Sequence, residues 1–218
     1  MSLFRPESCP AMPRLFPSLM LLAALGGCTA LPPSTAGVAV HDFGPLEAAT
    51  LAPVGIPLRN VEVVPAPWLA SNVMAYRLAY AQSTRRQAFK DNRWAAQPAQ
   101  LVELVLKRAL RAGDPATPAG GCRLRVDLDE FTQRFDSPQA SRGVIEARVT
   151  LLAPRTEQPL AVRAFALDHE APTADAAGGV AALRAGTLQL KSDIRNWLQG
   201  LEAAAPGPAG SLRTRCGS

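Results

Sequence analysis

The residues best suited to acid–base chemistry are Asp168, His169 and Glu170, which are consecutive in the sequence. Adjacent residues of a strand point to opposite faces of a sheet, so these three side chains cannot form a proton relay among themselves. The sequence contains no Gly-x-Ser-x-Gly nucleophile elbow and no paired-cysteine metal spacing. Its two histidines are too few for a histidine-built metal site. We therefore expect no enzymatic activity, no cofactor and no metal site.

The four cysteines are the other reactive side chains. Cys9 and Cys28 lie in the first thirty residues, which leaves Cys122 and Cys216 for the folded part of the chain. A bridge between these two is one alternative. Cys216 lies in an Ala-, Pro- and Gly-rich tail, however, and Cys122 opens an expected strand, so we expect two unpaired thiols.

The amino terminus has the pattern of an export signal. Arg5 and Arg14 precede an apolar run over residues 15–25, which is too short to span a bilayer as a helix. The run ends in Leu25-Gly26-Gly27-Cys28, which resembles a bacterial lipobox. Residues 1–27 are therefore expected to be a lipoprotein signal peptide, with translation starting at Met1 or at Met12, and Cys28 is expected to be lipidated. The alternative is an ordinary secretory signal with a cysteine nearby by chance.

Lipidation of Cys28 would fix the protein to a membrane, because two or three acyl chains anchor stably whereas one alone is marginal. Residue 29 is Thr rather than the Asp that usually retains such proteins at the inner membrane of enterobacteria. We therefore expect a lipid anchor in the outer membrane, on its periplasmic face. No later segment is expected to cross a membrane.

Composition limits the remaining choices. The chain has 218 residues, of which 48% are hydrophobic and 19% charged, a balance that excludes wholesale disorder and a multi-pass membrane protein. The net charge of +5 is too small and too dispersed for a nucleic-acid partner. We expect a lipidated cysteine and tether over residues 28–37, one domain over residues 38–202, and a disordered tail over residues 203–218.

Hydrophobic periodicity assigns the elements of that domain. Alternating residues predict strands over residues 38–43, 58–64, 73–80, 87–94, 122–135, 145–151 and 160–168, with a hairpin joining the third and fourth. The phase of the fifth strand changes near Asp129 and Glu130, which predicts a β-bulge there. Three-four spacing predicts helices from Pro98 to about residue 112 and over residues 180–201, the second capped by Thr173. The fold class is therefore α+β: a two-layer sandwich with a mixed, mostly antiparallel sheet of about six to seven strands and two main helices.

Several segments resemble the ABC-type transport auxiliary lipoprotein family, the group that contains the PqiC/YmbA-like lipoproteins. They are MAYRLAY at 74–80, RWAAQPAQL at 93–101, LDEFTQRFDS at 128–137, SRG at 141–143 and APTADAAGGV at 171–180, followed by Trp197. With the lipobox they span nearly the whole expected mature domain in the family's order. One departure is Trp68-Leu69-Ala70, where many relatives carry a Tyr-Leu-Asp-like step.

The resemblance implies a non-catalytic periplasmic partner of an MCE-type (mammalian cell entry) ABC transporter, which carries lipids between the two membranes. Its implied partner is an MCE-domain protein, and direct phospholipid contact and a homo-oligomer both stay open. An outer-membrane assembly scaffold that is not linked to an ABC transporter is the alternative, because it would share the anchor and the fold.

Four residues within the resembling segments are candidates for binding a partner or a lipid: Tyr76, Arg77, Arg93 and Trp94. The aromatic pair can equally belong to the core, and the arginines to a solvated strand face. Gly178-Gly179 also has two interpretations, an anion-binding nest or close packing of the helix on the sheet. Residues 141–143 are expected to form a turn.

Overall fold

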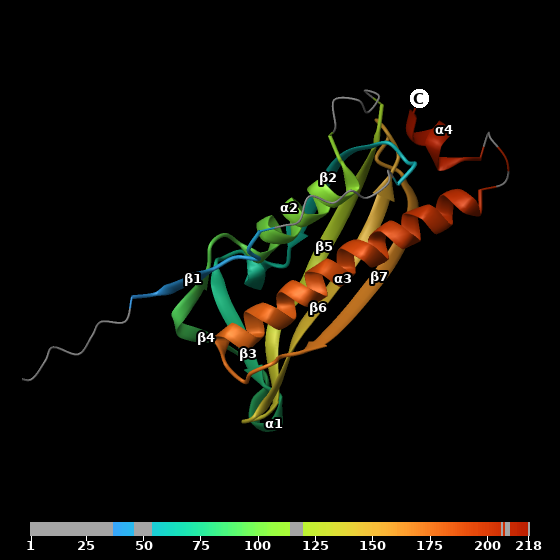
Figure 1. Ribbon diagram of the computed structural model, residues 1–218. Coiled ribbons are helices and arrows are strands. Elements are labelled where there is room, and N and C mark those ends of the chain that lie inside the picture. Colours follow the sequence, from blue (N-terminus) through green and yellow to red (C-terminus); the bar gives the residue numbers. More distant parts are fainter. Residues whose placement is uncertain (1–36, 46–53, 114–119, 206, 208–209, 218) are drawn as a thin grey trace, which may run out of the picture. The chain divides into compact units, whose positions relative to one another are not determined.

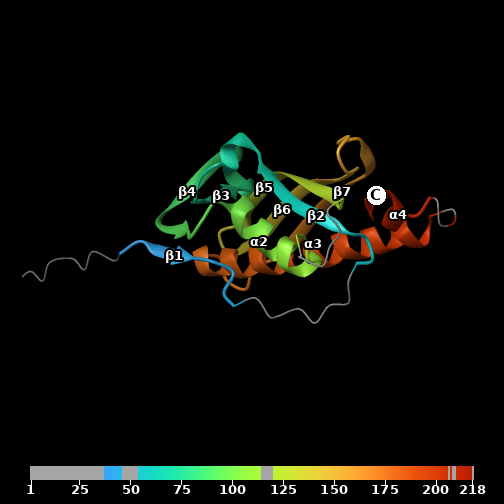
Figure 2. The ribbon, with the colours of Figure 1, turned by 90° about the horizontal axis from the view of Figure 1, so that it is seen from above.

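Seven strands form one mixed sheet in the part of the chain that the structure describes, and two long helices cover one face of it (Figure 1). The computed structural model describes residues 37–45, 54–113, 120–205, 207 and 210–217, all within the compact unit Gly37–Ser218. The expected signal peptide and Cys28 lie outside these residues. Figure 2 shows both long helices on the same side of the strands. The predicted α+β fold class is confirmed.

The sheet has the strand order β1-β4-β3-β5-β6-β7, with β2 paired to β5 outside this path. The strands are β1 (Ala39–His41), β2 (Leu58–Pro65), β3 (Val73–Leu78), β4 (Ser83–Trp94), β5 (Cys122–Ser137), β6 (Ala140–Leu152) and β7 (Pro159–Glu170). β3 and β4 form the predicted hairpin, joined by the short helix α1 (Ala79–Gln82). β5, β6 and β7 follow as an antiparallel meander.

Strand β5 organises the sheet because it has different neighbours along its length. Its first half pairs in parallel with β2, up to Leu128, and its last residues pair in parallel with β3. The register toward β6 shifts between Leu128 and Glu130, which confirms the predicted bulge. Before the bulge Leu124, Val126 and Leu128 are fully buried, and the alternation changes phase after it. The bulge therefore lies between the part of β5 that pairs with β2 and the part that pairs with β3.

Helix α2 (Pro98–Leu110) follows the predicted pattern closely. Gln97 and Gln100 exchange hydrogen bonds as a capping box, and Pro98 occupies the first turn, where no backbone donor is needed. Its apolar face is buried against β2 and the core. The helix ends at Arg111, which adopts a left-handed conformation with φ of 53°.

Helix α3 (Ala176–Ala203) crosses the sheet and packs mainly on β6 and β7. Its cap is Asp175 and not the predicted Thr173. The Asp175 carboxylate accepts a hydrogen bond of 2.8 Å from the backbone N–H of Gly178, while the Thr173 hydroxyl donates to the same oxygen over 2.8 Å. Asp175 is the residue directly before the helix, so its carboxylate reaches the free N–H groups, and Thr173 supports the cap through its hydrogen bond to that carboxylate.

The predicted turn at residues 141–143 is wrong. Pro138 and Gln139 make the turn, and Ser141 to Gly143 already belong to β6, paired with residues 133–135 of β5. A β-carbon on Gly143 would lie 2.8 Å from the backbone nitrogen of Leu183 in α3. Glycine at this position thus reflects close helix-to-sheet approach and not turn chemistry.

The carboxy-terminal segment departs furthest from expectation. Residues 212–217 form helix α4 (Leu212–Gly217), where the sequence indicates a disordered tail, and Cys216 forms a disulfide with Cys122. Both cysteines are fully buried. Because they are bonded to each other, the expectation of two unpaired thiols is wrong. Leu212 joins the core beside them, and Glu202 accepts a hydrogen bond of 2.8 Å from the Ser211 hydroxyl. A short apolar anchor and one covalent bond hold this segment, and neither leaves a periodic signal in the sequence.

Candidate functional site

The structure does not assemble the four sequence-predicted binding residues into one site. Tyr76 and Arg77 are consecutive on β3, and Arg93 and Trp94 are consecutive on β4, so each pair is divided between the two faces of the sheet. Tyr76 and Trp94 lie on the face covered by the helices, whereas Arg77 lies on the opposite face with Glu130. The two faces must therefore be considered separately.

Trp94 belongs to the core. Its side chain is 2% exposed and makes edge-on contacts with Phe43 and Phe131, at ring-centroid distances of 5.8 and 5.6 Å. Edge-to-face packing of this kind adds to the stabilisation from apolar burial. A buried indole cannot touch a partner or a lipid, so the geometry supports the core interpretation.

Tyr76 and Arg93 also make internal contacts. The Tyr76 hydroxyl donates to the Gln87 side chain over 3.0 Å, and its ring lies 4.7 Å from that of Phe89. Arg93 donates from one guanidinium nitrogen to the carbonyl oxygens of Phe89 and Asn92. The Tyr76 contacts join β3 to β4, whereas those of Arg93 stay within β4.

Arg77 forms part of a charged cluster on the uncovered face of the sheet. Glu130, at the bulge of β5, accepts hydrogen bonds from Arg77 over 3.3 Å and from Arg86 over 2.8 and 2.9 Å. The Glu130 side chain is only 15% exposed, so the pairing takes place partly shielded from water. Two arginines against one carboxylate leave the cluster with a charge of +1.

A hollow of about 260 Å³ adjoins this cluster on the same face. Its lining includes Trp68, Leu69, Val73, Ala75, Arg86 and Ala88. Trp68 comes from the 3-10 helix η1 (Pro67–Leu69), is 58% exposed, and donates from its indole nitrogen to the Asp129 carbonyl over 3.2 Å. The departure from the family pattern at Trp68 therefore places a large apolar ring at the surface, beside a cationic cluster.

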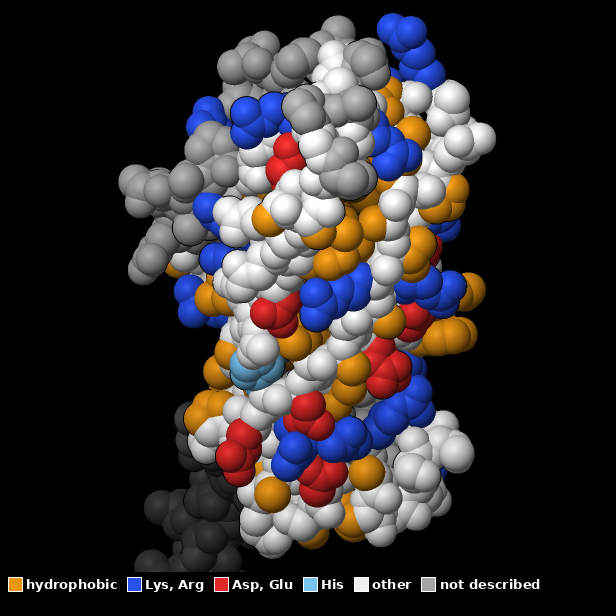
Figure 3. Space-filling model, turned by 90° about the vertical axis from the view of Figure 1, so that its right-hand side faces the viewer, with side chains coloured by type: hydrophobic (Ala, Val, Ile, Leu, Met, Phe, Trp, Pro, Cys, Tyr) orange, Lys and Arg blue, Asp and Glu red, His pale blue; other side chains and the backbone are white. Residues whose placement is uncertain are grey.

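Further along the uncovered face, two arginines and two aspartates alternate in a closed ring of ion pairs. Arg134 and Arg142 each contact both Asp136 and Asp168, at distances of 2.7 to 3.1 Å. The hydrogen bond to Asp136 and the charge of Asp168 raise the pKa of Arg142 further above its ordinary value. Figure 3 shows basic and acidic side chains intermixed on the side turned to the viewer. Because the charges cancel in this ring, it is not an anion site.

The acid–base candidates are separated as the strand geometry predicts. Asp168 lies on the uncovered face in the ion-pair ring, whereas His169 lies opposite, where a β-carbon on Gly186 of α3 would be 3.3 Å from its ring. Among the described residues, no group of three or more His, Cys, Asp or Glu side chains could hold a metal ion.

Under the start of α3 lies a buried polar network. The Gln133 amide donates to the Ser141 hydroxyl over 2.8 Å and to the Asp175 carbonyl over 2.9 Å. A β-carbon on Gly178 would lie 1.9 Å from the Thr173 carbonyl oxygen, and one on Gly179 would clash with Gln133. The geometry at Gly178-Gly179 is thus that of close packing, the second of the two interpretations.

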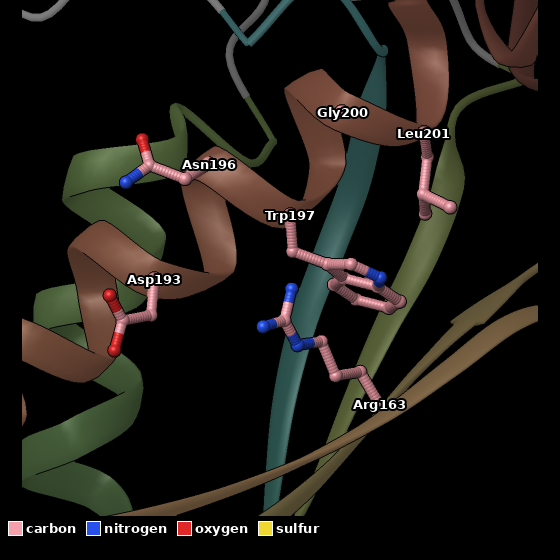
Figure 4. A pocket seen from close by; sticks show the side chains of 6 residues that line it. All are labelled: Arg163, Asp193, Asn196, Trp197, Gly200 and Leu201. Atoms are coloured by element: carbon pink, nitrogen blue, oxygen red, sulfur yellow. The ribbon is translucent and has the colours of Figure 1, made fainter. Parts of the chain in front are cut away.

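A second pocket, of about 400 Å³, lies between β7 and the last turns of α3 (Figure 4). It is lined by Arg163, Asp193, Asn196, Trp197, Gly200 and Leu201. None of the four sequence-predicted binding residues lines this pocket, although the sequence carries a signal for it. Arg163 shares the strand phase of Phe165 and Leu167, which are buried under α3, so an arginine occupies a position that faces the helix layer.

Within the ranges described, no helix is both long and apolar enough to cross a membrane. The described surface thus offers hydrogen-bonded guanidinium groups, one mainly apolar hollow beside Trp68 and one mixed polar and apolar pocket beside Trp197, which are features suited to binding.

Two solved structures share the fold. The fold resembles that of a crystal structure of a Xanthomonas campestris protein assigned to DUF330, at 18% identity with a TM-score of 0.62, covering 76% of this chain and 99% of that one. A crystal structure of an uncharacterized protein is similar at 18% identity with a TM-score of 0.57, covering 74% of this chain and 99% of the other. At these identities the likeness concerns the fold alone. No curated protein matches the sequence significantly.

The sequence model of the family described as ABC-type transport auxiliary lipoprotein component matches residues 48–195. This match covers more than half of the chain, and the chain therefore belongs to that family. The family resemblance found in the sequence is confirmed. The protein is thus a lipoprotein of the transport auxiliary class. The acceptor residue Cys28 itself lies outside the described residues and stays a prediction.

Proposed function

We propose that this protein is an outer-membrane-anchored periplasmic accessory lipoprotein of an MCE-type ABC transporter, and that it takes part in intermembrane lipid transport by docking to a partner protein. The observation that carries the proposal is the family match over residues 48–195 in a chain that has a lipobox cysteine at residue 28. The exposed Trp68 and the two surface pockets supply contact surface for docking. No step of bond making or breaking is needed for this role.

The anchor is tested by replacing the acceptor thiol. Cys28→Ala should stop incorporation of radiolabelled palmitate and release the protein from outer-membrane fractions, because two or three acyl chains provide stable anchoring. Cys9→Ala is the matched control, since Cys9 precedes the lipobox and is removed with the signal peptide. Palmitate incorporation and fractionation that do not change in Cys28→Ala would contradict the anchor.

The partner is tested by affinity purification of the full-length lipidated protein from native membranes under mild detergent. An MCE-domain subunit should co-purify, and mass spectrometry of the isolated complex should detect the bound lipid. Repeated recovery of outer-membrane assembly factors in place of an MCE subunit would favour the assembly-scaffold alternative and contradict the proposal.

A further inference from the structure

Strand β7 forms a long edge of the sheet. It comprises twelve residues, Pro159–Glu170, and pairs only with β6 among the described residues, whereas the other end of the strand order is the three-residue β1. The outward N–H and C=O groups of an edge strand can pair with another strand. β7 therefore offers a template of up to twelve residues.

The middle of β7 carries few of the features that protect natural edge strands. Its proline is the first residue, Pro159, it contains no lysine, and Arg163 is the one charge between Leu160 and Leu167. On the uncovered face it presents Val162, Ala164 and Ala166, all exposed, with Val162 at 55%. The small side chains leave room for those of a neighbouring strand.

On the opposite face, the α3–β7 pocket lies next to this edge. Its walls are Arg163 from β7 and residues 193, 196, 197, 200 and 201 of α3, which recur at helical spacing. A β-carbon on Gly200 would meet nothing within 4 Å, so the wall is open at that point. Every second side chain of a strand added at β7 would face α3, and the one opposite Arg163 could enter this pocket.

Arg163 differs from the arginines of strands β5 and β6. Each arginine of β5 and β6 has a carboxylate within 4.0 Å. Arg163 has no such carboxylate in the described part of the chain, and its guanidinium lies 5.2 Å from the centre of the Phe165 ring. Figure 4 shows the Arg163 side chain reaching from β7 toward Trp197 of α3. The guanidinium is therefore available to a carboxylate from outside the domain.

We propose that an extended segment of a partner protein adds to β7 as a further strand, with an acidic side chain of that segment bound by Arg163 in the α3–β7 pocket. Main-chain hydrogen bonds to the edge would supply affinity, and the pocket would supply specificity. Asp193, also in the pocket wall, favours a hydrogen-bond donor at a neighbouring inward position of the segment. The inference rests on the proposed function, which makes the MCE subunit the partner.

The test compares variants of the full-length lipidated protein in the co-purification described above. Arg163→Glu reverses the charge in the pocket, and Val162→Lys places a charge on the apolar side of the edge. Arg163→Glu should lower recovery of the MCE subunit about tenfold, the loss expected for one charge-assisted contact. Val162→Lys should lower it to a similar extent, because a lysine on an edge strand disfavours pairing with a further strand. Arg163→Lys keeps the charge and should retain most of the binding. Hydrogen exchange of the wild-type complex should show β7 amides protected relative to the free protein.

Two matched controls separate the edge from general surface effects. Arg148→Glu reverses an exposed arginine on the uncovered face of β6, and Val40→Lys alters the 65% exposed valine of the opposite edge strand. Both should recover the MCE subunit at the wild-type level. Thermal unfolding of every variant checks that the fold persists.

Failure of the inference can be told apart from failure of the proposed function. If the wild-type protein recovers no MCE subunit, the proposed function is wrong and this inference with it. If wild type, Arg163→Glu and Val162→Lys all recover the subunit equally, the proposal that the partner docks on β7 is wrong. Arg163 would then be an inward-facing charge that protects the edge strand from pairing. If Val40→Lys loses the MCE subunit while Val162→Lys retains it, the inference is also overturned, because the contact then lies at β1.

Discussion

The side-chain oxygen of Gln133 occupies the space where a side chain at residue 179 would begin: a β-carbon on Gly179 would lie 2.1 Å from that oxygen. The Gln133 amide meanwhile donates to Ser141 and to the carbonyl of Asp175. Three segments that carry the family resemblance, around residues 133, 141 and 175–179, thus meet in one buried network. The network fixes the first turn of α3 on strands β5 and β6, and it needs glycine at residue 179.

We predict that Gly179→Ala lowers the free energy of unfolding by roughly 1–3 kcal/mol, the usual cost of forcing extra atoms into a packed interior. The added methyl group must displace Gln133, whose amide then loses partners inside the protein. Urea denaturation measures the change.

Gly200→Ala is the control in the same helix. A β-carbon there meets nothing within 4 Å, so alanine should stabilise the protein by about 0.5–1 kcal/mol through the lower backbone entropy of the unfolded chain. Equal effects of the two substitutions would show that helix propensity alone operates and that the Gln133 contact is irrelevant.

Most of the fold could be predicted because its signals are local. The alternation in β5 and its change of phase indicated both the strand and the bulge, and Pro98 marked the first turn of α2. The main elements therefore required no knowledge of tertiary contacts. The sequence could not show that β2 and β3 both pair in parallel with β5, because pairing order depends on contacts far apart in the chain.

The errors share one physical cause. Gly143 looked like a turn residue, but its small size serves the approach of α3. Cys216 looked like part of a tail, but it is held by Cys122, 94 residues away in the sequence. Arg163 gave no local signal, because an arginine in the strand phase of buried residues becomes informative only when the helix layer above the strand is known. Each of these positions depends on a partner distant in sequence.

Reduction of the disulfide should destabilise the domain. The bond closes a loop with a sequence separation of 94, and constraint of the unfolded chain by a loop of that size is worth about 4–5 kcal/mol in the chain-entropy treatment. Urea midpoints measured with and without dithiothreitol should differ accordingly. In the double variant Cys122→Ser/Cys216→Ser the reductant should have no effect, and a wild-type midpoint insensitive to reduction would contradict the prediction.

Truncation of Trp94 should destabilise the protein strongly, whereas truncation of Trp68 should have little effect on stability. Trp94→Ala removes a ring that is 2% exposed and should cost about 3–5 kcal/mol in the free energy of unfolding. Trp68→Ala removes one that is 58% exposed and should change stability by no more than about 0.5 kcal/mol. Denaturation curves of both variants make the comparison, and a large loss in Trp68→Ala would show that its contact with the Asp129 carbonyl stabilises the bulge.

The cap of α3 predicts a pH dependence whose sign follows from Asp175. The N–H of Gly178, and after it the Thr173 hydroxyl, lower the pKa of this carboxyl in the folded protein. The folded state therefore favours the ionised form, and its contribution to stability is fully present above the unfolded value of about 3.9 and is lost as the pH falls through the lower folded pKa.

Asp175→Asn keeps an oxygen acceptor at the cap but removes this titration. The difference in unfolding free energy between wild type and variant should be constant near neutral pH and shrink below about pH 4. Thr173→Val removes one cause of the lowered pKa and should move that decline to higher pH. Denaturation series from pH 3 to 7 provide the measurement, and a difference that does not change with pH would show that Asp175 caps the helix without titrating differently in the folded and unfolded states.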